Sequence, residues 1–236
     1  MYLDTIPDCS YAKLIRSGAR VMALRDDGRA VGVVGVSDGA AIPADTIVRF
    51  DLVKGEDPGR RLRDALAQTA TRAFWFYGGD DVARRAAADL QFPLEPRGAV
   101  FVRRMDPVIR MADLTLRPPG PRDRMTLSEV HADQAPGFTA PETLFAQLGN
   151  DVVGVAMSEA LDPEWTELRV VVYPAYRGRG IGSAIFTAAA DKLESAGRLV
   201  CAAIETTEGR GRTALENAGF RLADYYFIAR RPARER

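Results

Sequence analysis

The chain has 236 residues, 47% of them hydrophobic, and its 32 Lys and Arg side chains balance 32 Asp and Glu side chains. This length suffices for one large domain or two smaller ones, each with a hydrophobic core. The balanced charge argues against a general nucleic-acid or membrane-surface binder, because such proteins need a basic excess. One histidine and two cysteines far apart in sequence, Cys9 and Cys201, argue against a metal site.

The start of the chain lacks the basic residues, long apolar run and small-residue cleavage site that together mark a secretory signal. No apolar stretch approaches the roughly 20 residues that cross a bilayer. We therefore expect a cytoplasmic protein with reduced cysteines and without membrane or nucleic-acid partners.

The first half predicts strands and helices in a mixed order. Its alternating or apolar runs indicate strands at 21–25, 30–36, 47–53, 73–77 and 99–104. The turn Asp26-Asp27-Gly28 joins the first two strands into a hairpin, and a helix with Leu62 and Leu66 on one face follows the third strand. A second helix is expected before the last strand.

The second half repeats this order, with strands predicted at 144–148, 151–158, 167–173, 199–204 and 227–231. Val31-Gly32-Val33 overlays Val153-Gly154-Val155 at an offset of 122 residues. At the same offset, Val48 and Phe50 fall on Val170 and Val172. The matched order of elements favours an internal duplication over a chance similarity.

The boundary between the two halves is predicted near residue 108, next to Pro107, so that residues 1–107 and 108–236 form separate domains. The second half has an additional segment before its hairpin, with a helix predicted at 126–134. Thr126 and Glu129 could form a capping box there, and His131 is interpreted as a residue on the surface of this helix.

The stretch Arg177-Gly178-Arg179-Gly180-Ile181-Gly182-Ser183 follows the β-branched run Val170-Val171-Val172 and precedes a predicted helix. Its glycines allow a tight turn and a close approach of the backbone to a ligand. The free N–H groups and the positive end of the helix dipole favour a phosphate at this point. Because Arg177 and Arg179 add forked cationic donors, the stretch predicts a site for a phosphate-bearing cofactor.

These residues resemble a known family. Arg177-Gly178-Arg179-Gly180-Ile181-Gly182 fits the Arg/Gln-x-x-Gly-x-Gly/Ala signature of the GNAT superfamily of acyl-CoA-dependent N-acetyltransferases, and Val172-Tyr173-Pro174 precedes it as in that family. Gly219-Phe220 follows, and the first half resembles a degenerate copy, as in tandem GNAT proteins. The resemblance implies an α/β (α+β) fold of two tandem units, each with a mixed, mostly antiparallel twisted sheet flanked by helices.

The resemblance also implies that acetyl-CoA is the cosubstrate, without a metal. Its pantetheine arm would pair with the backbone of Val170, Val171 and Val172 where the central strands splay apart. Its pyrophosphate would bind the amides of Arg177, Gly178, Arg179, Gly180, Ile181, Gly182 and Ser183. The acetyl group would pass directly to an amine of a small molecule or peptide while an N–H near Val172 polarises the oxyanion, and the protein would act as a monomer or homodimer.

Glu167, on the strand that leads into the glycine-rich loop, is the candidate general base, and its pKa would need to rise toward neutrality through burial. The alternative is that Glu167 only forms a surface ion pair with Arg169. For the general acid, Leu215 stands where many family members carry a tyrosine. Protonation of the leaving thiolate would then depend on Tyr225, Tyr226, Tyr173 or water.

Two other functions remain open from the sequence. Because Leu215 replaces the tyrosine that many family members use, the protein could be a non-catalytic acyl-CoA sensor or scaffold. A dinucleotide-binding enzyme is a weaker alternative, because Gly178-x-Gly180 also follows a strand and opens a helix. In the first half, Glu56 and Asp57 occupy the place of the glycine loop, and their charge makes cofactor binding there improbable.

Overall fold

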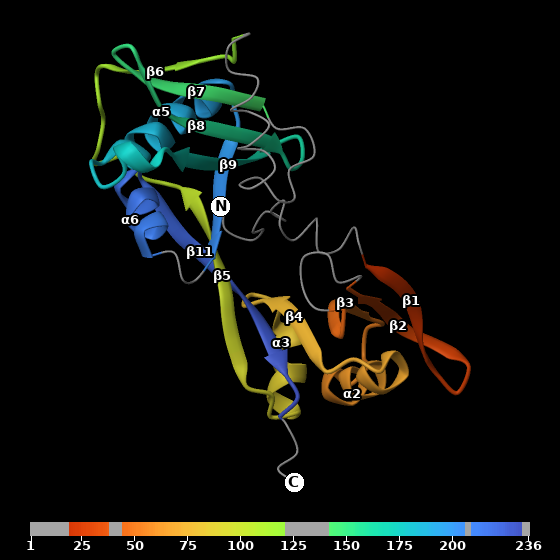
Figure 1. The fold of residues 1–236 in the computed structure, drawn as a ribbon. Coiled ribbons are helices and arrows are strands. Elements are labelled where there is room, and N and C mark those ends of the chain that lie inside the picture. The colour runs from red at the N-terminus through yellow and green to blue at the C-terminus, as the bar shows by residue number, and fades with distance from the viewer. Residues whose placement is uncertain (1–18, 38–43, 121–141, 206–208, 233–236) are drawn as a thin grey trace. The chain divides into compact units, whose positions relative to one another are not determined.

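The computed structural model describes residues 19–37, 44–120, 142–205 and 209–232 (Figure 1). The predicted helix at 126–134, with Thr126, Glu129 and His131, lies outside these ranges, as does Cys9. The described residues divide into two compact units. We call residues up to 98 together with those from 224 onward the N-terminal unit, and residues 99–223 the C-terminal unit.

The N-terminal unit contains helices α2 (Pro58–Thr69) and α3 (Asp81–Asp89) and a mixed sheet. Its strands are β1 (Arg20–Asp26), β2 (Arg29–Val36), β3 (Thr46–Leu52), β4 (Ala73–Tyr77) and parts of β5 (Leu94–Arg103) and β11 (Phe220–Arg230). Their order is β1-β2-β3-β4-β11-β5. Strands β1, β2 and β3 are antiparallel neighbours, whereas β3 and β4 run parallel.

The C-terminal unit contains helices α5 (Ile181–Ser195) and α6 (Gly209–Asn217) and the short 3-10 helix η2 (Pro174–Tyr176). Its further strands are β6 (Leu114–Arg117), β7 (Glu142–Leu148), β8 (Asp151–Ala160), β9 (Trp165–Val172) and β10 (Leu199–Glu205). Together with the remaining parts of β5 and β11 their order is β11-β5-β10-β9-β8-β7-β6. Strands β6 to β9 are antiparallel, and β9 and β10 are parallel.

The predicted α/β (α+β) fold, with mixed twisted sheets flanked by helices, is confirmed. The predicted strands of both hairpins lie within two residues of the observed ones, because alternating apolar and polar side chains mark a half-buried strand locally. The short strand β6 was not predicted. It lies at the end of the strand order, where a few residues suffice to pair with β7.

The two hairpins share their detailed register. Leu24 pairs with Gly32 and Ala146 pairs with Gly154, and each ladder shifts directly after that pair. The offset of 122 residues predicted for the hairpins is therefore present in their geometry. A bulge at the same position in both places also gives the two hairpins the same local distortion.

The predicted overlay of the third strands was wrong. Gly32 pairs with Leu52 and Gly154 pairs with Val172, so the partner of Val172 in the first half is Leu52 and not Phe50. The offset is thus 120 residues in this strand. The reason is that the chain between the paired glycine and the third strand is two residues shorter in the second half, a difference that side-chain alternation cannot reveal because it has a period of two.

The last strand of the chain completes the sheet of the N-terminal unit. Residues Tyr226 to Arg230 of β11 pair with Tyr77 to Ala73 of β4 in antiparallel register. Beneath them lies a core that includes Leu62, Phe74 and Ala229. None of the described helices is both long and apolar enough to span a bilayer, and the described residues contain no group of three or more potential metal-ligating side chains.

Candidate functional site in the C-terminal unit

Strands β9 and β10 part from one another halfway along their length. Their parallel register runs from Trp165 opposite Leu199 to Glu167 opposite Cys201 and ends there, although both strands continue. Over the same length β9 keeps its pairing with β8 as far as Val172. The edge of β9 from residue 168 to 172 therefore faces a gap in the described sheet, as the resemblance implied.

The backbone of Val172 points into this gap. The N–H of Tyr173 donates to the carbonyl oxygen of Val153 at 3.0 Å. Because successive N–H groups of a strand point to opposite edges, the N–H groups of Val172 and Val170 face away from β8. Arg177 Nε donates to the carbonyl oxygen of Val172 at 3.0 Å, which places this guanidinium at the same edge.

The loop after β9 is held by its own backbone and by a tyrosine. The N–H of Tyr176 donates to the carbonyl oxygen of Tyr173 at 2.9 Å, closing η2. Burial, and after it the charge and hydrogen bond of Asp151, raise the pKa of Tyr176. The hydrogen bond of its hydroxyl to Asp151 ties the loop to the first residue of β8.

The glycines of the loop adopt conformations that other residues avoid. Gly178 and Gly180 have φ of 79° and 76°, in the left-handed region. A Cβ atom on Gly178 would meet no atom within 4 Å, whereas one on Gly180 would lie 3.6 Å from Ile109 Cδ1. Gly180 caps α5 without any side-chain hydrogen bond, so the first turn of this helix is left open.

A run of main-chain N–H groups is free at this point. In the described part of the chain, the N–H groups of residues 178–183 have no acceptor, and the first bond of the helix is Ala184 N–H to Gly180 O at 3.1 Å. Val172 lies beside this run, since a Cβ on Gly182 would be 3.4 Å from Val172 Cγ2. Free N–H groups at a helix start form an anion-binding site, and this site adjoins the gap between β9 and β10.

Glu167 is fully buried at the point where the gap begins. Its Oε1 lies 3.7 Å from Arg169 Nη2, so the ion pair considered from the sequence exists, with the carboxylate inside the protein rather than on its surface. Side chains alternate along a strand, which puts Glu167 on the same face as Val171 and Tyr173. Glu159 is its direct partner on β8.

Residues 108–216 match the family model of the acetyltransferase (GNAT) family. The match lies within the C-terminal unit, residues 99–223, which we call the GNAT domain from here on. Three solved structures share the fold at low sequence identity, and no curated protein matches the sequence.

The first of these structures is an acetyltransferase of the GNAT family from Colwellia psychrerythraea (13% identity, TM-score 0.76, covering 98% of this chain and 92% of that one). The second is a tandem GNAT protein from the clavulanic acid biosynthesis pathway, determined without AcCoA, with 15% identity and a TM-score of 0.59. The match covers 98% of this chain and 91% of that one. The third is a GCN5-related N-acetyltransferase from Kribbella flavida, with 15% identity and a TM-score of 0.53. The match covers 95% of this chain and 94% of that one. At these identities the likeness concerns the fold.

The antiparallel pairing of β8 and β9 also bears on the dinucleotide alternative. A dinucleotide-binding turn connects a strand of a parallel sheet to a crossover helix within successive βαβ units. In the GNAT domain the strand before the glycine loop instead follows a hairpin, and of its two neighbours β8 is antiparallel and β10 is parallel to it. The topology therefore removes the support that the glycine spacing gave to this alternative.

The tyrosines considered as general acid for the leaving thiolate lie in different units. Tyr225 and Tyr226 belong to the N-terminal unit, so the structure does not place them in the unit that carries the glycine loop. The Tyr226 side chain is 3% exposed, and its ring centroid lies 5.9 Å from that of Trp75. Tyr173 lies within the GNAT domain, directly after β9, and Leu215 is fully buried in α6.

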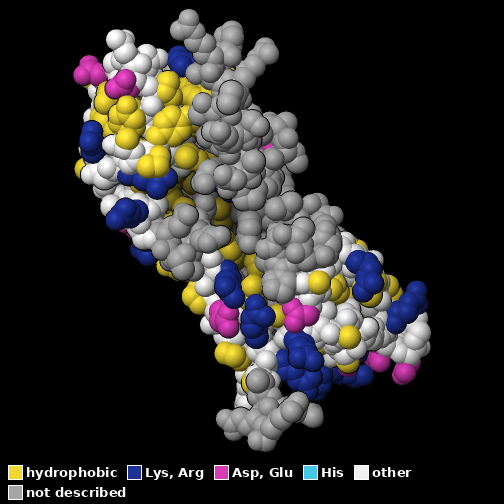
Figure 2. Space-filling view, viewed as in Figure 1, with side chains coloured by type: hydrophobic (Ala, Val, Ile, Leu, Met, Phe, Trp, Pro, Cys, Tyr) yellow, Lys and Arg dark blue, Asp and Glu magenta, His cyan; other side chains and the backbone are white. Residues whose placement is uncertain are grey.

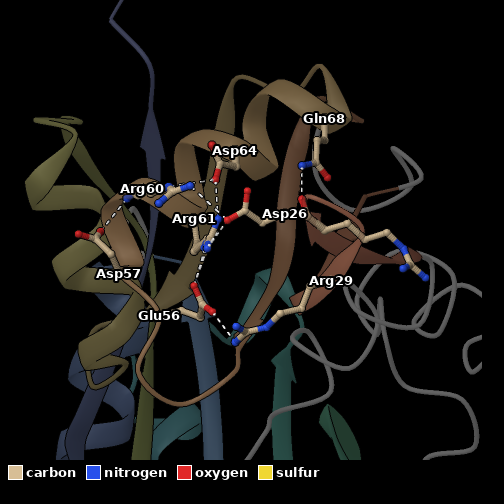
Figure 3. A network of polar contacts seen from close by, with 9 residues as sticks. Asp26, Arg29, Glu56, Asp57, Arg60, Arg61, Asp64 and Gln68 are labelled. Atoms are coloured by element: carbon tan, nitrogen blue, oxygen red, sulfur yellow. Dashed lines mark hydrogen bonds and ion pairs between the residues drawn. The ribbon is translucent and has the colours of Figure 1, made fainter.

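The corresponding loop of the N-terminal unit is occupied by its own side chains. The Asp57 carboxylate accepts from the N–H of Arg60 at 2.8 Å and so caps α2 (Figure 3). The guanidinium of Arg61, with 6% of its side chain exposed, binds Asp26 at 2.7 Å, Glu56 at 2.6 Å and Asp64 at 3.1 Å. Hydrogen bonding to Arg61 is the main cause that lowers the pKa of Asp26.

Sequence reasoning missed this network around Arg61. It identified Glu56 and Asp57 as obstacles to phosphate but did not assign them a partner. The signal in the sequence was an arginine in the first helical turn next to two carboxylates. The missing information was the contact with Asp26, which lies 35 residues earlier and reaches Arg61 only through the hairpin turn.

The gap between β3 and β4 differs in its side chains from that between β9 and β10. The parallel register of β3 and β4 also ends early, at Ile47 opposite Phe74. Phe50 of β3 and Phe74 of β4 make an edge-to-face contact with ring centroids 5.6 Å apart, and Phe74 stacks on Phe76 at 5.1 Å. In the GNAT domain the corresponding segment of β10 is Cys201-Ala202-Ala203.

Proposed function

We propose that the GNAT domain transfers an acetyl group from acetyl-CoA directly to an amine of a small molecule or peptide. The observation that carries the proposal is the run of free N–H groups at residues 178–183 beside the parted strands β9 and β10. This combination offers one place for a diphosphate and one for an extended amide chain, the two parts of coenzyme A that precede its thioester.

The cosubstrate fits the described geometry. The diphosphate would accept from the N–H groups of residues 178–183, with Arg177 and Arg179 supplying charge. The amides of the pantetheine arm would pair with the edge of β9 at Val170–Val172 that β10 leaves uncovered, as an added strand does, and would replace the bond from Arg177 Nε to the Val172 carbonyl oxygen. The N–H of Val172 then faces the thioester carbonyl and supports the developing oxyanion.

Glu167 is the proposed general base for the acceptor amine. It lies where β9 and β10 part, which is next to the end of the pantetheine path. A base at this position accepts the proton of the amine as nitrogen attacks the thioester carbon, and the thiolate of CoA then leaves. For protonation of the thiolate, Tyr173 in the same unit is a candidate beside the sequence-predicted Tyr225 and Tyr226.

The N-terminal unit is proposed to be a degenerate copy without a cofactor. Three observations support this role: the shared hairpin register, the self-capped start of α2 at Asp57, and the aromatic core contact of Phe50 and Phe74 between the strands β3 and β4. The Asp57 carboxylate already accepts from the N–H of Arg60 at the helix start that would hold a phosphate, and its charge repels one. The unit then serves the GNAT domain as a structural partner.

A non-catalytic acyl-CoA sensor is the second candidate, favoured by the buried Leu215 in α6. Thiol release from acetyl-CoA with a panel of small amines, amino acids and peptides distinguishes the two. Release that depends on an amine supports the transferase. Tight CoA binding without thiol release for any acceptor would favour the sensor, and absence of CoA binding would overturn both.

A further inference from the structure

The N-terminal unit has a groove that the proposed acyl transfer does not use. Its volume is about 640 Å³, and it lies between the last turns of α2, the turn that follows α3 and the residues after β11. Its lining includes three apolar side chains and three charged ones, namely Leu66, Leu90, Phe92, Arg63, Asp89 and Arg231. The groove is thus amphipathic.

The turn that forms one wall of this groove has a counterpart in the GNAT domain at an offset of 128 residues. The N–H of Leu90 donates to Ala86 O, and the N–H of Ala218 donates to Ala214 O. The next residue has a positive φ in both cases, 53° at Gln91 and 83° at Gly219. The two turns therefore present their backbone carbonyl groups in the same way.

In the C-terminal unit this turn holds the chain segment that follows β5. The carbonyl oxygen of Asn217 accepts from Val108 N–H at 2.8 Å and from Ile109 N–H at 3.3 Å. The carbonyl oxygen of Gly219 accepts from the N–H groups of Arg104 and Met105, both at 3.1 Å. Residues 104–109, which bend at 105 and 108, are thus bound through main-chain hydrogen bonds, while the side chains of Met105 and Val108 are exposed.

The same two acceptors are free in the N-terminal unit. Within the described ranges, no donor reaches the carbonyl oxygens of Asp89 or Gln91, which correspond to Asn217 and Gly219. The guanidinium groups of Arg63 and Arg231 likewise make no ion pair or hydrogen bond with any described residue. The N–H groups of a bound peptide would satisfy the carbonyl groups, and an acidic side chain on it would pair with the arginines.

We propose that this groove docks a peptide segment of a partner protein that carries apolar side chains and at least one carboxylate. The apolar wall of Leu66, Leu90 and Phe92 takes the apolar side chains, and the two arginines select the carboxylate. Figure 2 shows a dense group of Lys and Arg side chains on the unit that contains α2, which would also attract an acidic segment.

The chain's own end is a poorer chemical match than a partner. At the offset of 128 residues, the residues that correspond to 105–108 are 233–236, which lie outside the described ranges. Their sequence is Ala-Arg-Glu-Arg, which offers one carboxylate, Glu235, but no large apolar side chain and two further arginines. Residues 105–109 of the other groove, in contrast, carry Met105, Val108 and Ile109 together with Asp106.

The test is a fluorescently labelled peptide with the sequence of residues 105–111, titrated with the intact chain and followed by anisotropy. We expect saturable binding that weakens at least tenfold in Ala67→Trp, an exposed position in the groove. Ala88→Trp, equally exposed on α3 but outside the lining, is the matched control and should bind normally. A peptide with Asp106→Lys should also bind at least tenfold more weakly.

Two results would overturn the proposal. One is absence of saturable binding to the intact chain, or equal binding to Ala67→Trp. The other concerns a variant that ends at Pro232. If the peptide binds only to this variant, the chain's own last residues occupy the groove and no partner docks there.

Discussion

Ile47 holds the position in the N-terminal unit that Glu167 holds in the GNAT domain. Each is the last residue of its strand to pair with the parallel neighbour, Ile47 with Phe74 and Glu167 with Cys201. Each also lies five residues before the residue that pairs with the hairpin glycine, Leu52 or Val172. The unit without a glycine loop thus has an apolar side chain where the GNAT domain has its candidate base.

Glu167→Gln tests this base. The amide keeps the shape of the side chain but cannot accept a proton from an amine, so the turnover number with an active amine should fall about 100-fold or more. The affinity for CoA, measured by calorimetry, should stay within a factor of about three. Glu164→Gln, at an exposed position, is the control. Unchanged turnover in Glu167→Gln would remove the assignment.

Ala70 and Gly197 offer a matched pair at helix ends. Both have a positive φ, 55° and 78°, and in both cases the next N–H donates back into the helix, Thr71 to Leu66 O and Arg198 to Leu193 O. Because a Cβ atom is strained in this region, Ala70→Gly should raise the free energy of unfolding by about 1 kcal/mol, and Gly197→Ala should lower it by a similar amount. Urea denaturation measures both, and the same sign for the two substitutions would contradict the geometry.

Arg61→Met tests the network in Figure 3. Removal of the guanidinium leaves Asp26, Glu56 and Asp64 close together without their common cation. The melting temperature at pH 7 should fall by roughly 5 °C or more. Since Arg61 lowers the pKa of Asp26, the stability that this pair contributes is present above pH 4 and is lost as the pH falls through the lowered pKa. The difference in melting temperature between the unchanged protein and Arg61→Met should therefore shrink below pH 4.

Thr46 and Thr166 differ in the partner of their hydroxyl groups. Thr166 Oγ1 accepts from Arg198 Nε at 2.9 Å, whereas the fully buried Thr46 Oγ1 has no hydrogen-bond partner among the described residues. Thr46→Val should therefore leave the free energy of unfolding unchanged or raise it, while Thr166→Val should lower it by about 1–2 kcal/mol. A larger loss for Thr46→Val than for Thr166→Val would show that the buried hydroxyl is satisfied.

The sequence predicted the elements near the site well because its signals are local. The run Val170–Val172 predicts a strand, and Gly178 and Gly180 permit the positive-φ turn before α5, whereas Gly182 lies within the first turn of that helix. The hairpin repeat followed from alternation and from the turn residues for the same reason.

Features that depend on distant parts of the chain could not be predicted. The pairing of β11 with β4 joins residues about 150 positions apart, and no periodicity marks which strand will neighbour which. The two-residue difference between the third strands is invisible to a pattern with a period of two. The burial of Glu167 is set by several strands together, whereas the sequence shows only its neighbour Arg169.

A calorimetric titration of CoA into the intact chain and into Gly180→Glu tests the central claim most directly. The new carboxylate would project into the anion site from a left-handed position next to Ile109, where it is both strained and repulsive to a diphosphate. We predict one CoA per intact chain and no detectable binding to Gly180→Glu, with circular dichroism showing an unchanged fold. Two equivalent CoA sites per chain, or undiminished affinity in Gly180→Glu, would contradict the account.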